Sequence, residues 1–282
     1  MTTGRASNNK SSAAKTNKAP SNVPKNQGWS TVGIVLLMLI WVGASVIASQ
    51  FIVGMAMVTM LGAEELSRPV PMAIYTALSY LLALVLIVFV PIRAKKLWLK
   101  RHRVNSKGNN EPSIDREDLG LKSWPTWTDI GLAPVGFILY MFLAAGLAAI
   151  FSCFPWFQAD EAQQLGFSIY STGLDRAIAF LILVVVAPVA EEIIFRGWLY
   201  GKLRETFHGI MPKTTGMLLA IFLTSLLFGI VHLQWNVGVN VFALSVVLCG
   251  LREVTGTIYA GILLHMLKNG VAFYLLYVLG LS

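Results

Sequence analysis

The stretch APVAEEIIFR, residues 187–196, places two glutamates and an arginine inside an otherwise apolar run. The run continues on both sides, as LILVVV at 181–186 and GWLY at 197–200. A carboxylate at membrane depth costs several kcal/mol unless it is paired or wet. The stretch therefore predicts a helix that crosses a bilayer and carries chemistry inside it.

The rest of the chain has the composition of a polytopic membrane protein. Of its 282 residues, 56% are hydrophobic and 13% are charged, and the mean hydropathy is +0.66. Its apolar runs have the length that spans a bilayer. We therefore predict an all-α transmembrane bundle of about seven spans, with a break near Gly54 as the alternative for the first. The predicted spans are 31–61, 71–91, 130–154, one that begins near 177, 217–233, 237–251 and 258–281.

The basic residues set the expected orientation. Residues 1–28 carry five lysines and arginines, and residues 93–122 carry nine. Such clusters beside spans are cytoplasmic and contact anionic headgroups, so the net charge of +8 does not indicate nucleic acid. We predict a disordered basic cytoplasmic tail at 1–28, two transmembrane helices and a basic cytoplasmic loop at 29–129, and a transmembrane domain at 130–282. The protein should be a multi-pass protein of the cell membrane with a cytoplasmic N-terminus.

The glutamate pair predicts two different environments. Glu192 and Arg196 are four residues apart, so they face each other on a helix and favour a structural ion pair. Glu191 points about 100° away on the same helix. Without a full ion partner its carboxylate is a candidate general base. The alternative is that both glutamates lie at a cytoplasmic helix end.

Two later apolar runs each supply a polar pair at helical spacing. Phe228 and His232 are four apart in one, and His265 and Asn269 are four apart in the other. Two donors at that spacing can hold one oxyanion between them. The plain alternatives are a hydrogen-bonded packing histidine and an interhelical hydrogen-bond clamp. Lys268, between the second pair, has no assigned role.

Taken in order, these motifs resemble a known family, the type II CAAX prenyl endopeptidases and their bacterial CPBP relatives. The resemblance rests on E-E-x-x-x-R at 191–196, F-x-x-x-H at 228–232 and H-x-x-x-N at 265–269, and covers about residues 176–276. It implies a helical intramembrane endopeptidase without a covalent intermediate. By that resemblance Glu191 and His232 activate a water, and His265 and Asn269 hold the oxyanion. The remaining motif residues, Glu192, Arg196 and Phe228, give structural support.

The resemblance also implies the partners. The substrate would be a membrane-associated or lipidated peptide in the lipid bilayer. No cofactor is expected: a zinc ion on Glu191, His232 and His265 is chemically possible, but metal-free activation is favoured because acid, base and donor groups are already present. H-E-x-x-H and G-x-S-x-G are both absent from the sequence. A non-catalytic immunity or scaffold protein and a proton-relaying transporter are the alternatives from other classes.

Depth is the main difficulty for this hypothesis. At about 1.5 Å per residue, Glu191 lies roughly 22 Å from the outer entry of its span, and His232 roughly 22 Å from the inner entry of the next. The two side chains can meet only if a predicted boundary is wrong by several residues or Pro188 kinks the helix. A separation of more than about 10 Å between the Glu191 carboxylate and both histidines would exclude a shared water.

Overall fold

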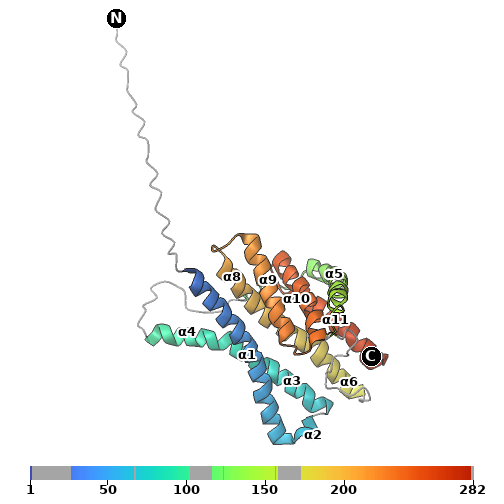
Figure 1. Cartoon of the computed structure of the whole chain (residues 1–282). Coiled ribbons are helices and arrows are strands. Elements are labelled where there is room, and N and C mark those ends of the chain that lie inside the picture. The colour runs from blue at the N-terminus through green and yellow to red at the C-terminus, as the bar shows by residue number, and fades with distance from the viewer. Residues whose placement is uncertain are drawn as a thin grey trace.

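A computed structural model describes residues 1, 27–66, 68–101, 116–122, 124–155, 157 and 173–280. Every regular element within those ranges is a helix, and Figure 1 shows them gathered into one bundle with α4 projecting from it. The predicted tail lies outside the described residues except for Met1, Gln27 and Gly28. Most of the predicted basic loop, residues 102–115, also lies outside them.

Two long helices form the N-terminal part of the bundle. The first, α1 (Gln27–Leu61), runs unbroken through Gly54, and the short α2 (Ala63–Leu66) follows it. The second is continuous through α3 (Pro69–Leu84), the π-helical η1 (Val85–Phe89) and α4 (Val90–Arg101). Because α1 packs along α3, these two helices form one wall beside the C-terminal helices (Figure 1).

The third span is α5 (Trp127–Phe151), which begins three residues before the predicted start at Ile130. Its start is fixed by a capping box: the Thr126 hydroxyl accepts from the Asp129 amide, and the Asp129 carboxylate accepts from the Thr126 amide. These bonds satisfy donors that a helix start leaves without intrahelical partners. Polar capping therefore extends this helix beyond its apolar run.

The fourth span is one long helix of alternating α and π character. It consists of α6 (Gly173–Phe180), η2 (Leu181–Val186), α7 (Ala187–Glu191), η3 (Glu192–Tyr200) and α8 (Gly201–Phe207). Pro188 stands near the start of α7, and no N–H of its own is available to continue the ladder. The glutamate pair thus lies at the junction of α7 and η3.

The last three spans complete the bundle. They are α9 (Lys213–Ile230), α10 (Trp235–Thr255) and α11 (Tyr259–Phe273), which continues as η4 (Tyr274–Val278). Helix α10 packs against α5, α9 and α11. Its end is fixed by Gly256, which takes the left-handed conformation (φ 70°) that glycine adopts without strain. Figure 1 shows these helices side by side with the fourth span.

Among the described residues, seven helices are long and apolar enough to cross a membrane. This confirms the predicted all-α fold and the number of spans. The observed helix ends explain why the predicted spans placed Glu191 and His232 at different depths. Since α8 ends at Phe207 and α9 starts at Lys213, Glu191 lies about 24 Å and His232 about 28 Å from the same connecting loop, at about 1.5 Å per residue. The error lay in the predicted boundaries.

Candidate active site

A cavity of about 330 Å³ lies among α1, α3, the fourth span, α9 and α11. Its walls include Glu191, His232, His265 and Asn269, so the structure brings all four sequence-predicted catalytic candidates to one enclosed space. Helices α1 and α3 supply the opposite wall, with Ser49 from α1 and several residues of the stretch 75–83 from α3. The cavity therefore depends on both the N-terminal helices and the C-terminal ones.

Glu191 is held at the cavity by two neighbours. The Tyr80 hydroxyl, on α3, donates a hydrogen bond to its Oε1, and the Nε2 of His265 lies 3.6 Å from its Oε2. Its side chain is 12% exposed. Sequence reasoning missed Tyr80, although a buried tyrosine hydroxyl normally finds a polar partner. The available signal was a tyrosine in the second apolar run, which contains both Tyr75 and Tyr80.

Glu192 and Arg196 form the ion pair that their spacing predicted. The Arg196 Nη1 donates to the Glu192 Oε1 at 2.8 Å, and both side chains are fully buried. The Arg196 guanidinium also lies over the ring of Phe228, 4.4 Å from its centroid, where a cation is attracted by the π face. Phe228 in turn packs edge-on against Phe195, with centroids 4.8 Å apart. The three motif residues therefore join the fourth span to α9 beneath the cavity.

His265 lies between the two glutamates. Its Nδ1 is 3.1 Å from the Glu192 Oε1, while its Nε2 faces Glu191. Gly261, one turn earlier on α11, makes room for this arrangement, since a Cβ there would stand 2.9 Å from the Glu192 Oε2. The carboxylate thus rests directly on the α11 backbone. Sequence reasoning did not identify Gly261, because a glycine has no side chain whose spacing could indicate what it contacts.

His232 follows the end of α9. Its Nδ1 lies 2.7 Å from the Phe228 carbonyl oxygen. Because a carbonyl only accepts, the Nδ1 carries the proton in the neutral ring and the Nε2 keeps a free lone pair. Burial lowers the pKa of His232 below its ordinary value, although the charge of Glu191 opposes the shift. The imidazole is therefore neutral near pH 7.

Asn269 is anchored by a backbone carbonyl that the fourth span leaves available. Its Nδ2 donates to the Leu183 oxygen at 2.9 Å. In the π segment the Ala187 amide bonds to the Ile182 oxygen, and the next residue, Pro188, has no amide proton. The Leu183 carbonyl has thus lost both possible helical donors. Irregular π turns of this kind concentrate at functional sites.

Lys268 also lines the cavity. The charges of Lys268 and Glu191 both act on the His232 imidazole. In the described part of the chain no carboxylate forms an ion pair with Lys268 within 4 Å. The residue that sequence reasoning left without a role is therefore a cavity residue that influences the charge of a candidate catalytic group.

The zinc alternative would need Glu191, His232 and His265 in one metal-holding arrangement. Across the ranges that the structure describes, no group of three or more His, Cys, Asp or Glu side chains is arranged to hold a metal ion. The Nδ1 of His232 and that of His265 each lie beside a protein oxygen, which leaves their Nε2 atoms for other contacts. We assign no reaction step to a metal.

Fold and cavity together define a polytopic helical membrane protein with a buried Glu/His site, the class that contains intramembrane proteases. Residues 173–271 match the family model described as type II CAAX prenyl endopeptidase Rce1-like. The match runs from the start of α6 into α11 and contains every predicted site residue. The similarity of this segment to Rce1-like domains is consistent with a CPBP family protease. No curated protein and no solved structure matches the chain.

Proposed function

We propose that the protein is an intramembrane endopeptidase that hydrolyses a peptide bond of a membrane-associated or lipidated peptide with an activated water. One observation carries the proposal: Glu191, His232, His265 and Asn269 line a single cavity within a bundle of apolar helices. The Rce1-like match supports a protease of this general type. The residue roles that follow are part of the proposal.

In the first step, Glu191 and His232 activate the water. The Glu191 carboxylate takes a proton from it, while the lone pair on the His232 Nε2 accepts a hydrogen bond and orients the oxygen. The water oxygen then attacks the scissile carbonyl carbon, and the carbonyl oxygen becomes an oxyanion. Tyr80 acts as a positioning residue, because its hydroxyl fixes one oxygen of the carboxylate and leaves the other toward the cavity.

In the second step, His265 and Asn269 stabilise the oxyanion. Asn269 uses one amide hydrogen on the Leu183 carbonyl and has a second one to donate. His265, with a carboxylate at each ring nitrogen, can present an Nε2–H at the cavity. Donors already fixed before the charge develops are the most effective electrostatic catalysts. When the C–N bond breaks, the proton held by Glu191 passes to the leaving amine.

The proposed reaction needs no metal and no other cofactor. Acid, base and oxyanion-donor roles are all filled by protein side chains. The location and the orientation are also part of the proposal. The protein spans the cell membrane, and the basic segments at 1–28 and 93–122 favour a cytoplasmic N-terminus.

Substitution of Glu191 tests the function. Membrane peptides from cells that produce the wild-type protein and the Glu191→Ala variant are compared by mass spectrometry. The matched control is Glu65→Ala, since the Glu65 side chain is 45% exposed on α2. We expect uncleaved substrates to accumulate only with Glu191→Ala. If Glu191→Ala accumulates normally in the membrane and its peptide profile equals the wild-type profile, the scaffold or immunity alternative holds instead.

A further inference from the structure

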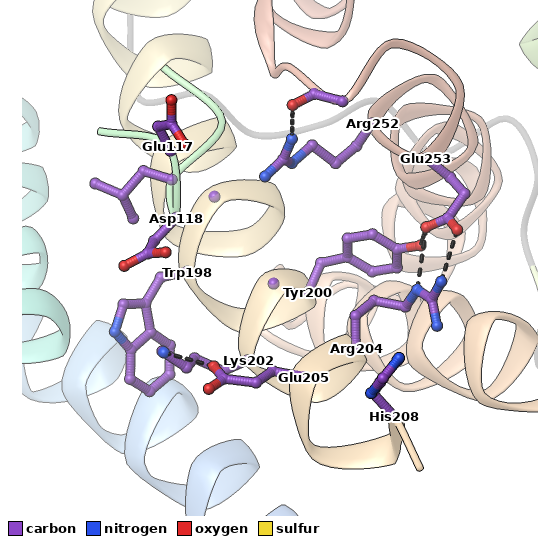
Figure 2. A pocket seen from close by; sticks show the side chains of 14 residues that line it. Glu117, Asp118, Trp198, Tyr200, Lys202, Arg204, Glu205, His208, Arg252 and Glu253 are labelled. Atoms are coloured by element: carbon purple, nitrogen blue, oxygen red, sulfur yellow. Dashed lines mark hydrogen bonds and ion pairs between the residues drawn. The ribbon is translucent and has the colours of Figure 1, made fainter. Parts of the chain in front are cut away.

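A second cavity, of about 540 Å³, lies where α8 and the end of η3 meet the α10–α11 turn and residues 117–119. Figure 2 shows its mainly charged lining. It shares no lining residue with the candidate active site. Its volume falls in the range of about 300–1,000 Å³ that is typical of small-ligand pockets.

Two ion pairs neutralise much of the charge on one side of this cavity. Arg204 binds Glu253 through two hydrogen bonds of 2.7 and 3.0 Å, and the Tyr200 hydroxyl donates to the same carboxylate at 2.6 Å. Lys202 pairs with Glu205 at 2.7 Å. These four charged groups satisfy one another, so other residues must determine which ligand the cavity takes.

Arg252 is a cation held in place by backbone. Its Nη1–H donates to the Gly256 carbonyl, and its guanidinium rests on Gly120, where a Cβ would stand 2.6 Å from the Cζ. Gly120 has a φ of 72°. Among the described residues no carboxylate forms an ion pair with Arg252, and Glu253, which acts on it electrostatically, is already bound by Arg204. A fixed guanidinium with spare N–H groups suits a phosphate.

The opposite side of the cavity is acidic. Figure 2 shows Glu117 and Asp118 across the cavity from Arg252. The segment that carries them is tied to the bundle, because the Ile258 amide donates to the Gly120 carbonyl at 3.2 Å. A cation site and an anion site thus face the same space at a fixed separation. That pattern matches a ligand that bears one negative and one positive group.

Two exposed tryptophans indicate that the cavity lies near the level of the lipid headgroups. Trp124 and Trp127 follow the Glu117–Leu121 segment along the chain, and their side chains are 89% and 87% exposed. Indole rings prefer the membrane–water interface. Because the segment is anchored to both the cavity wall and the start of α5, the cavity opens near that interface.

We propose that this cavity binds the headgroup of a phospholipid that carries a primary amine. Its phosphate lies against the Arg252 guanidinium, and its ammonium lies against the Glu117 carboxylate. Charge-assisted hydrogen bonds of both signs then fix one headgroup orientation. A trimethylated headgroup cannot donate to the carboxylate, and a glycerol headgroup has no cation for it.

The test measures lipid retention by the full-length protein. Protein purified in detergent is mixed with phosphatidylethanolamine, phosphatidylcholine or phosphatidylglycerol of identical acyl chains, and bound lipid is counted by native mass spectrometry. We expect phosphatidylethanolamine to bind at least about tenfold more tightly than either of the others, given the worth of a hydrogen bond to a charged group. Arg252→Gln should remove this binding, and Glu117→Gln should bring the amine lipid and the choline lipid close to equality.

Arg68→Gln is the matched control, because Arg68 is a surface arginine paired only locally with Glu65; it should leave all three affinities unchanged. Glu117 is exposed, so Glu117→Gln keeps the test valid if Arg252→Gln fails to fold. Equal binding of the three lipids, or a preference for the glycerol lipid, would overturn the proposal. Binding of soluble phosphoethanolamine as tightly as the lipid would also overturn it, by assigning the site to a soluble phosphate ester.

Discussion

Breaking the buried Glu192–Arg196 pair should destabilise the protein strongly. Both side chains are fully buried, and their charged atoms are 2.8 Å apart. Arg196→Met leaves the Glu192 carboxylate, and Glu192→Met leaves the guanidinium, without its counter-charge. Removing one partner of a buried pair costs about 3–5 kcal/mol. We expect a loss of that size in the free energy of unfolding for either single variant.

The double variant Glu192→Met/Arg196→Met should be much less destabilised than the sum of the two single changes. Replacing a whole buried pair by apolar side chains is often neutral or better. One deficit remains, because Glu192 also accepts the His265 Nδ1 at 3.1 Å, and a buried donor without a partner costs about 1–3 kcal/mol. The double variant should therefore fold yet lose activity, since His265 is no longer held.

The assay is reversible unfolding in mixed detergent micelles, followed by tryptophan fluorescence. The matched control is the exposed pair Lys202–Glu205 on α8, at 34% and 70% exposure, where Lys202→Met should cost no more than about 1 kcal/mol. Losses that simply add in the double variant would refute the reasoning, because they would show that the two groups do not interact.

Four further outcomes follow from the cavity. Tyr80→Phe removes the donor to Glu191 and should lower kcat/KM about 10- to 100-fold, with unfolding unchanged; an unchanged rate would contradict the positioning role. Because burial lowers the pKa of His232, activity should fall only below pH of about 6.5 as the ring gains a proton. Lys268→Met removes a cation that disfavours protonation of His232, so the acidic limb of the pH profile should move to higher pH, and movement to lower pH would oppose this account. Cleavage by purified protein should survive EDTA; loss with EDTA and recovery with zinc would replace metal-free activation by a metal mechanism.

Hydropathy was enough to predict the helical fold, because only closed backbone hydrogen bonding is tolerated in lipid. It was poorer at helix ends, where polar contacts decide. The charged residues after Tyr200 do not end the fourth span, because Glu253 binds the Arg204 guanidinium and the helix continues to Phe207. The Thr126–Asp129 capping box extended α5 in the same way.

Helical spacing predicted the contacts within one helix better than those between helices. The Glu192–Arg196 pair follows from a separation of four residues, which fixes both side chains on one face. Tyr80 and Gly261 reach the glutamates from other helices, and no local pattern tells which neighbour such a residue faces. The role of the Leu183 carbonyl could not be predicted from the sequence either, because this carbonyl becomes a free acceptor only through the π turn before Pro188.

That π turn sets an angular phase along the fourth span. A π turn holds about one residue more than an α turn, so the same residues wound as a regular α-helix would rotate everything that follows them. The direction of Glu191 relative to the Leu183 carbonyl would then change by about 100°, the rotation of one α-helical residue. The wide turn thus absorbs one residue and keeps Glu191 in register with the carbonyl that anchors Asn269.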